Sequence, residues 1–402
     1  MKFAHLADCH IGSWRDPRLL EISVKAFEMA VDKCIDEDVD FVLISGDLFN
    51  TALPGISRLK SVVIKLKELR DYGINVYVIQ GSHDFSPTGK TMLDVLESAG
   101  LVYNVVRGSV VNGKLRLNFT KDSKTGAMIA GMLGKKGMLE KSYYEDLDRV
   151  SLETEEGFKV FMFHTALTEL KSAELNKMES APLSLLPKGF DYYAGGHVHE
   201  VIEEEPEGYG KIVYPGPCFP NSFREVEKLK HGGFYLYDDG KTRFEPLRIF
   251  DVYSVSLDCK NKSCEEIHSS LKDYAKDNVK DKIVTLRLYG KILSGRISDI
   301  NLGEIINEFY ESGAYFVMKN TAGLTTPEFE EIKIKNESVD ELEDNLIKEH
   351  CAGDKFIQEE AEFTKEMINA LMIEEEEGER KVDFEERVKE SADKVFEKIN
   401  QL

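Results

Sequence analysis

Apolar stretches alternate with helical patterns over about the first 247 residues of the chain. Seven of these stretches are short and rich in β-branched and aromatic residues, which predicts strands at residues 2–7, 39–45, 74–80, 159–164, 190–195, 211–216 and 232–238. A helix is predicted between the second and third strands, where apolar residues recur with a 3.6-residue period at Leu59, Val62, Val63, Leu66 and Leu69. This alternation indicates an α/β fold with a largely parallel inner sheet.

A smaller pattern begins near residue 248. Strand-like runs lie near residues 250–257, 283–290 and 314–319, and helical patterns lie near 264–275 and 302–310. The chemistry that recurs at the strand ends of the first part stops here. We therefore expect a separate α+β domain over residues 248–336.

Beyond residue 336 the chain becomes rich in glutamate, and the run EEEEGERK at 374–381 separates two amphipathic segments. Apolar residues of the second segment form a helical stripe at Phe384, Val388, Ala392, Val395, Ile399 and Leu402. Such a stripe needs an apolar surface, either on a partner protein or on the preceding domain. The predicted domains are therefore 1–247, 248–336 and 337–402.

The chain has 402 residues and is 42% hydrophobic, enough for two or three separate cores. No stretch approaches the roughly 20 apolar residues of a membrane helix, and a strand-like run at residue 2 leaves no room for a signal peptide. We expect a cytoplasmic protein that does not enter membranes. Its six cysteines are scattered without a CxxC pair, which favours reduced and buried thiols.

The formal net charge of −21 is unevenly distributed. Residues 337–402 contain 22 acidic and 9 basic residues, a net charge of −13, which leaves −8 for the first 336 residues. Bound divalent cations would add positive charge where a phosphate must lie. The overall sign therefore does not exclude a nucleic-acid substrate.

Potential metal ligands follow five of the predicted strands. They lie in the segments Asp8-Cys9-His10, Gly46-Asp47, Gly81-Ser82-His83-Asp84, His164 and Gly195-Gly196-His197-Val198-His199. A single such residue is usually a cap or a satisfied polar group. Because open α/β sheets place ligand sites at the carboxyl ends of their strands, five in the same register favour a common site.

The spacing of these residues gives a physical reason for their convergence. Residues i and i+2 of a strand point the same way, so Asp8 and His10 are expected to reach one centre, as are His197 and His199. Carboxylate and imidazole ligands without thiolate suit Mn²⁺, Fe²⁺ or Zn²⁺. The number of candidate ligands indicates two ions, which together could clamp a phosphoryl group during its transfer.

The motif order DxH, GD, GSHD, H, GHVH resembles that of the calcineurin-like metallophosphoesterases. Within that superfamily, residues 1 to about 247 most resemble the Mre-eleven nuclease family of the archaeal type, called SbcD in bacteria. The resemblance is carried by SGDLFN, GSHDFSPTGKTMLDVLESAGL, GGHVH and YPGP followed by SFREVE. It implies a β-sandwich flanked by helices, followed by a small α+β cap domain and a helical tail.

The resemblance also implies roles for the site residues. One ion would be held by Asp8, His10, Asp47 and His199, and the second by Asp47, Ser82, His164 and His197. Asp47 would bridge the two ions, and metal-activated water would be the nucleophile. His83 would assist the leaving oxygen, with Asp84 orienting its imidazole.

Three residues depart from the family pattern. Ser82 replaces the usual asparagine ligand, and its hydroxyl is a poorer neutral ligand, which predicts a looser second ion. Asn50 stands where the family often has histidine, and Pro217 ends a YPGP turn that is usually YPGS. The changes at Asn50 and Pro217 bear on endonuclease preference more than on activity.

The function implied is a DNA nuclease with two Mn²⁺ ions per subunit that processes double-strand breaks. It would act as a 3′–5′ exonuclease on duplex DNA, a single-strand endonuclease, or both. Because the chain holds no nucleotide-binding loop, a Rad-fifty/SbcC-type ATPase is the expected partner, bound through residues 354–402, and a homodimer is expected. The alternatives are another phosphodiesterase or phosphatase of the superfamily, and a metal-free scaffold.

Basic residues in two loops are candidates for contacting DNA phosphates, although such clusters are often only solvated surface. They are Arg15 and Arg18, beside Trp14, and Lys135 and Lys136 in a glycine-containing loop. The run GSVVNGKL from Gly108 is close to a phosphate-binding loop, but it lacks the final Ser or Thr. Asn112-Gly113 between alternating residues predicts a hairpin turn instead.

Overall fold

A computed structural model describes residues 1–86, 90–135, 137, 139–326, 357–373 and 381–399. The chain divides into two compact units, Met1–Pro327 and Glu328–Leu402. The boundary expected at residue 247 is not tested by this division and stays a prediction. The two units are described separately below.

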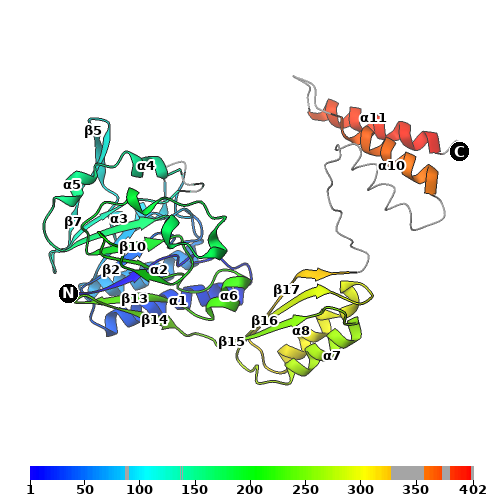
Figure 1. Ribbon diagram of the computed structural model, residues 1–402, viewed down its shortest axis with the longest axis horizontal. Helices are drawn as coiled ribbons and strands as arrows, with labels where there is room; N and C mark the ends of the chain where they lie inside the picture. Colours follow the sequence, from blue (N-terminus) through cyan, green and yellow to red (C-terminus); the bar gives the residue numbers. More distant parts are fainter. Residues whose placement is uncertain (87–89, 136, 138, 327–356, 374–380, 400–402) are drawn as a thin grey trace. The chain divides into compact units, whose positions relative to one another are not determined.

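Two six-stranded sheets form a sandwich in the first unit (Figure 1). The first has the order β14-β13-β1-β2-β3-β4, with bounds Lys241–Leu247, Gly232–Asp238, Lys2–Leu6, Phe41–Ser45, Asn75–Ile79 and Tyr103–Asn104. The second has the order β11-β12-β10-β9-β8-β7, with bounds Ile202–Glu204, Lys211–Tyr214, Tyr192–Gly196, Lys159–His164, Met128–Gly131 and Thr120–Lys121. β1 to β4 are mutually parallel, and so are β8, β9, β10 and β12.

The predicted α/β sandwich is thus confirmed, with all seven predicted strands present. Strands β4, β7, β8, β11 and β14 were not predicted. In β2 the side chains of Phe41 and Leu43 join the core between the sheets, whereas Val42 and Ile44 join the core under the helices. Both faces of this strand are buried, so its sequence is continuously apolar and does not alternate.

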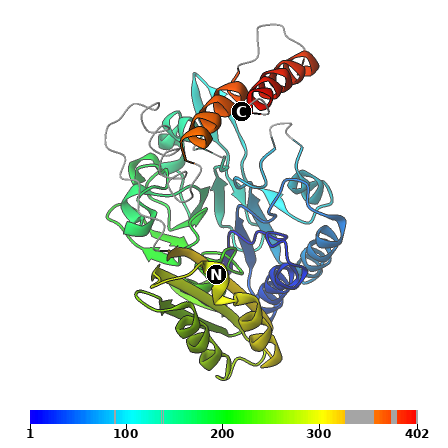
Figure 2. The same ribbon diagram turned by 90° about the vertical axis from the view of Figure 1, so that its right-hand side faces the viewer.

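Three helices cover the outer face of the first sheet. They are α1 (Pro17–Asp36), α2 (Ile56–Asp71) and α3 (Met92–Ser98), and Figure 2 shows the first two in blue beside their sheet. The start of α1 is fixed by Asp16, whose carboxylate accepts the backbone N–H of Arg18, and by Pro17 at the first helical position. The apolar stripe predicted for α2 is confirmed, since Val62, Leu66 and Leu69 are buried.

The outer face of the second sheet is covered by short elements. They are α4 (Lys141–Glu145), α5 (Arg149–Glu153), η2 (Thr168–Leu170), η3 (Ala173–Leu175) and η4 (Leu183–Leu185). The predicted hairpin is confirmed: β5 (Gly108–Val111) pairs with β6 (Lys114–Leu117). Asn112 and Gly113 both have positive φ, 51° and 76°, as a two-residue hairpin turn requires.

A smaller parallel sheet follows, in the order β15-β16-β17, with bounds Val252–Asp258, Ile283–Lys291 and Phe316–Thr325. It has its own core with α7 (Cys264–Ala275), η5 (Ile297–Ile300) and α8 (Leu302–Glu311), and Figure 1 shows α7 and α8 on one face. Helix α6 (Phe223–Leu229) contacts all three strands. One contact is a two-pronged hydrogen bond from the Arg287 guanidinium to the Glu227 carboxylate, at 2.6–2.9 Å.

The second unit contains two helices in its described residues, α10 (Ile357–Leu371) and α11 (Lys381–Ile399). They pack on each other, and the ring centroids of Phe363 and Phe396 are 5.9 Å apart. The predicted helical tail is confirmed, although Phe356 and Leu402 of the predicted apolar set lie outside the described residues. Among the described helices, none is both long and apolar enough to cross a membrane.

Candidate metal centre

The site lies where the loops after β1, β2, β3, β9 and β10 meet. Four residues of these loops have left-handed backbone conformations: Asp8 (φ 49°), His10 (φ 41°), Asp47 (φ 52°) and His197 (φ 83°). Each such conformation costs a non-glycine residue about 1–2 kcal/mol. Strain concentrated on candidate ligands is typical of a site whose side chains are held in place for function.

Backbone amides fix the two central carboxylates. The Asp8 carboxylate accepts the N–H of His197 at 2.9 and 3.0 Å, and Asp47 Oδ1 accepts the N–H of His83 at 2.7 Å. The β1 and β2 loops are joined directly, because the N–H of His10 donates to the Asp47 carbonyl at 2.9 Å. The carboxylates are therefore positioned before any ion binds.

Two glycines leave room for this packing. A Cβ atom on Gly46, which has a φ of 85°, would lie 2.3 Å from Nδ1 of His164. A Cβ atom on Gly81 would lie 2.3 Å from Oδ1 of Asp47. Neither position tolerates a side chain without displacing a candidate ligand.

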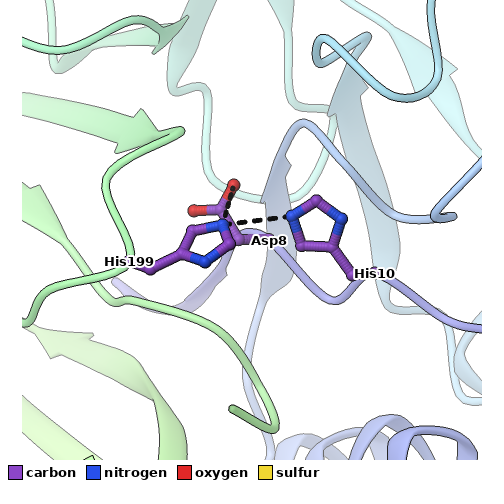
Figure 3. A group of neighbouring side chains, drawn as sticks. All are labelled: Asp8, His10 and His199. Carbon is purple, nitrogen blue, oxygen red and sulfur yellow. Dashed lines mark hydrogen bonds and ion pairs between the residues drawn. The ribbon is translucent and has the colours of Figure 1, made fainter. Parts of the chain in front are cut away.

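One group of potential ligands consists of Asp8, His10 and His199 (Figure 3). Nε2 of His10 is 3.1 Å from Nε2 of His199, which in turn is 3.9 Å from Oδ1 of Asp8. Burial lowers the pKa of His10 to about 3, so its imidazole is neutral and offers a lone pair. Nδ1 of His199 lies 3.3 Å from Oε1 of Glu225, which leaves Nε2 facing the group.

A second group consists of Asp8, Asp47 and His164. Nδ1 of His164 donates to the Ser45 carbonyl at 2.8 Å, so in the neutral ring Nε2 is an acceptor. This buried Nε2 has no hydrogen-bond partner within the described part of the chain, and it lies 3.2 Å from Oδ2 of Asp47. A cation fits between these two atoms, either a proton on the ring or a metal ion that replaces it.

The two carboxylates near His164 also affect the pKa of its ring. Burial opposes its protonation, yet the carboxylates of Asp47 and Asp8 raise the pKa of His164 to about 10. Asp47 belongs to two groups, one with Asp8 and His164 and another with His10 and His83. This shared position fits a bridging ligand.

The other two expected ligands lie at the edge of these groups. Oγ of Ser82 is 3.4 Å from Oδ2 of Asp47. The ring of His197 lies 5.3 Å from that of His164, centroid to centroid, and burial lowers the pKa of His197 to about 4. Both side chains face the same cavity as Asp47.

The expectation that Asp84 orients the His83 imidazole was wrong. Asp84 instead accepts the backbone N–H groups of Leu48, Phe49 and Gly81 at 3.1–3.3 Å. Nδ1 of His83 bonds the Asn50 carbonyl at 3.0 Å. Burial and the nearby Asp47 charge raise the pKa of Asp84 to about 7. Asp84 therefore fixes the loops that carry the ligands.

The family model described as "Calcineurin-like phosphoesterase" matches residues 1–201, half of the chain. The chain belongs to the calcineurin-like phosphoesterase family. Curated relatives of this phosphoesterase include "DNA double-strand break repair protein Mre11" of Archaeoglobus fulgidus, 30% identical over 280 residues, with 64% of this chain and 62% of the relative covered. The chain thus spans less than two thirds of that relative's length.

Two further relatives of the phosphoesterase carry the same name. The one from Methanococcus maripaludis is 25% identical over 287 residues, with 69% of this chain and 72% of the relative covered. The one from Sulfolobus acidocaldarius is 25% identical over 400 residues, with 95% of this chain and 97% of the relative covered. The similarity therefore extends beyond the matched family domain.

A cavity of about 340 Å³ opens onto the candidate ligands of the phosphoesterase. The site residues that line it are His10, Asp47, Ser82, His83, His197 and His199. Three charged lining residues lie on α6 and were missed from the sequence: Arg224, Glu225 and Lys228. The signal was present, because the run SFREVEK after the YPGP turn places Arg224 and Lys228 four residues apart.

Three of the basic residues expected to bind DNA, Arg15, Arg18 and Lys135, do not line this cavity. Arg18 pairs with Asp16 at 3.2 Å and lies over the Phe316 ring, so it joins α1 to the smaller sheet. Lys135 donates to the Tyr143 hydroxyl at 2.7 Å, and Arg15 is exposed. Lys136 lies outside the described residues. Their DNA contacts stay a prediction.

The cysteines of the described residues form no disulfide bonds and are buried, as predicted. Cys9, between the candidate ligands Asp8 and His10, turns away into the apolar core, and so does Val198 between His197 and His199. Cys351 lies outside the described residues.

Proposed function

We propose that this chain is a metal-dependent phosphodiesterase that hydrolyses the backbone of DNA, using two Mn²⁺ ions. One observation supports the metal chemistry above all: the unpartnered Nε2 of buried His164 faces the Asp47 carboxylate. The Mre11 names of the relatives support DNA as the substrate and double-strand-break repair as the process.

The proposed ligands are Asp8, His10, Asp47 and His199 for one ion and Asp47, Ser82, His164 and His197 for the other. Two bound ions would supply an activated water and neutralise charge on the phosphoryl oxygens. Nδ1 of His83 donates to the Asn50 carbonyl, so His83 would give a proton to the leaving oxygen from Nε2 of its protonated ring, the imidazolium. Asp84 supports this arrangement through the backbone of both neighbouring loops.

On the resemblance to the Mre-eleven/SbcD family, we propose that the chain acts as a 3′–5′ exonuclease on duplex ends, as a single-strand endonuclease, or as both. We also propose a homodimer, and a Rad-fifty/SbcC-type ATPase that binds residues 354–402. The ATPase proposal is supported by α10 and α11, because Leu371 and Phe396 remain more than half exposed beside their helix contact. An apolar face of this kind favours a partner helix or groove.

The direct test is cleavage of duplex and single-stranded oligonucleotides with Mn²⁺, with Mg²⁺ or with chelator. We expect cleavage with Mn²⁺ and none with chelator. Hydrolysis of phosphomonoesters alone would favour a phosphatase, and bound Mn²⁺ without any hydrolysis would favour a scaffold. Unchanged cleavage in chelator would refute the two-metal mechanism.

A further inference from the structure

Two cations on α6 form part of the cavity wall. Arg224 and Lys228 lie one helical turn apart, and both donate to Oε2 of Glu174, each at 2.9 Å. Glu174 lies on the short turn η3, so it reaches the cations from a different part of the chain. One carboxylate oxygen thus holds two cations at the mouth of the phosphoesterase site.

Arg224 and Lys228 are linked to the candidate ligand His199 by residues next to them in the sequence or bonded to them. Glu225, next to Arg224, contacts the His199 ring at 3.3 Å. Lys228 also bonds Glu200 at 2.5 Å, and Glu200 directly follows His199 in the sequence. A strand whose phosphate lay at the metal ligands would therefore bring a neighbouring phosphate to this pair.

The contact with Glu174 is of a kind that a phosphate can replace. The side chains of Arg224, Lys228 and Glu174 are between 45% and 63% exposed, and exposed ion pairs contribute little net free energy. A phosphate carries more acceptor oxygens than a carboxylate, and the planar guanidinium binds two of them at once. Glu174 therefore occupies the position that a phosphate would take.

We propose that Arg224 and Lys228 form a second phosphate subsite beside the metal centre, and that Glu174 occupies this subsite until a polynucleotide displaces it. The proposal rests on the proposed function and specifies its substrate: a strand with at least two neighbouring phosphates. Leu175 and Met178 line the same cavity next to Glu174 and offer apolar surface to a sugar or base.

The proposal predicts opposite changes in KM when Arg224 and when Glu174 is neutralised. Arg224→Gln should raise the KM for a single-stranded oligonucleotide and reduce the salt dependence of its binding, by a slope of about 0.7 per lost phosphate contact. Glu174→Gln removes the competing carboxylate, so it should lower the same KM about twofold to fivefold. If Glu174 only stabilises the fold, Glu174→Gln would not lower the KM for the oligonucleotide.

The experiment compares the oligonucleotide with bis(p-nitrophenyl) phosphate, a diester without a neighbouring phosphate. We expect Arg224→Gln to raise the KM for the oligonucleotide by a larger factor than the KM for the small diester. Arg243→Gln is the matched control, because Arg243 is an exposed, ion-paired arginine on β14 that does not line the cavity. It should change neither KM.

The outcomes separate this proposal from the proposed function. Wild-type protein that hydrolyses the small diester but no oligonucleotide would refute DNA as the substrate. Wild-type cleavage of the oligonucleotide with the same KM in Arg224→Gln, Lys228→Gln and Glu174→Gln would refute the subsite alone. A higher KM in Glu174→Gln would also refute it, because the carboxylate would then assist binding.

Discussion

The geometry around His83 allows two roles for this residue, metal ligand or catalytic proton donor. Its ring lies 4.7 Å from that of His10, centroid to centroid, and it belongs to a potential ligand group with His10 and Asp47. Its Nδ1, however, is engaged by a backbone carbonyl. A catalytic imidazole at this place would leave metal binding to the buried carboxylates and the other histidines.

We therefore expect His83→Ser to remove most turnover, by a factor of about 10²–10⁴ for the loss of a proton donor. The protein should still bind two Mn²⁺ ions per chain, measured by elemental analysis after dialysis. A parallel loss of metal would reassign His83 as a ligand.

The candidate ligands could be predicted because they lie at the ends of apolar strands. The backbone conformation of these residues could not be predicted. Asp8 and His10 do lie in one group, as their spacing predicted, but both are left-handed and do not continue the strand alternation. The role of Asp84 was missed for a related reason. Two of its three partners are amides of a loop more than 30 residues away, and no local pattern encodes them.

Helix α6 is the element that connects the metal centre with the smaller sheet. Its N-cap is Ser222, whose hydroxyl accepts the N–H of Glu225, and the Glu225 carboxylate faces His199. Two residues further on, Glu227 holds Arg287 of β16. The same short helix thus positions a candidate metal ligand and contacts the smaller sheet.

Glu225→Gln should weaken Mn²⁺ binding about tenfold or more, because a carboxylate behind a histidine ligand fixes its ring and increases its basicity. Isothermal titration with Mn²⁺ measures this directly. Glu245→Gln serves as the control, since Glu245 pairs with Lys33 and Arg243 away from the cavity. Equal affinities for the two variants would show that Glu225 acts only as a helix cap.

Elements with strong local signals were predicted well. Helix α7 begins and ends at the expected residues, because Ser263 and Glu266 form a capping box before a regular apolar stripe. Strands β4, β7 and β11 have only two or three residues, and such strands are defined by their neighbours in a sheet more than by their own sequence.

At the scale of the whole molecule, the acidic tail is the part that we propose binds a partner ATPase. Deleting residues 354–402 should leave Mn²⁺-dependent cleavage and the thermal midpoint of the first unit unchanged. Copurification with a coexpressed Rad-fifty/SbcC-type ATPase should be lost, because the exposed apolar faces of α10 and α11 would be gone. A deletion that unfolds the remaining protein, or that leaves the complex intact, would contradict the proposal.

The central claim is a pair of Mn²⁺ ions bridged by Asp47. Electron paramagnetic resonance of the Mn²⁺-loaded protein tests it most directly, because two ions about 3.5–4 Å apart couple magnetically. We expect a coupled signal at two equivalents of Mn²⁺, replaced in Asp47→Asn by the six-line signal of isolated ions together with loss of cleavage. Isolated ions in the wild-type protein, or no bound Mn²⁺, would contradict the two-metal centre.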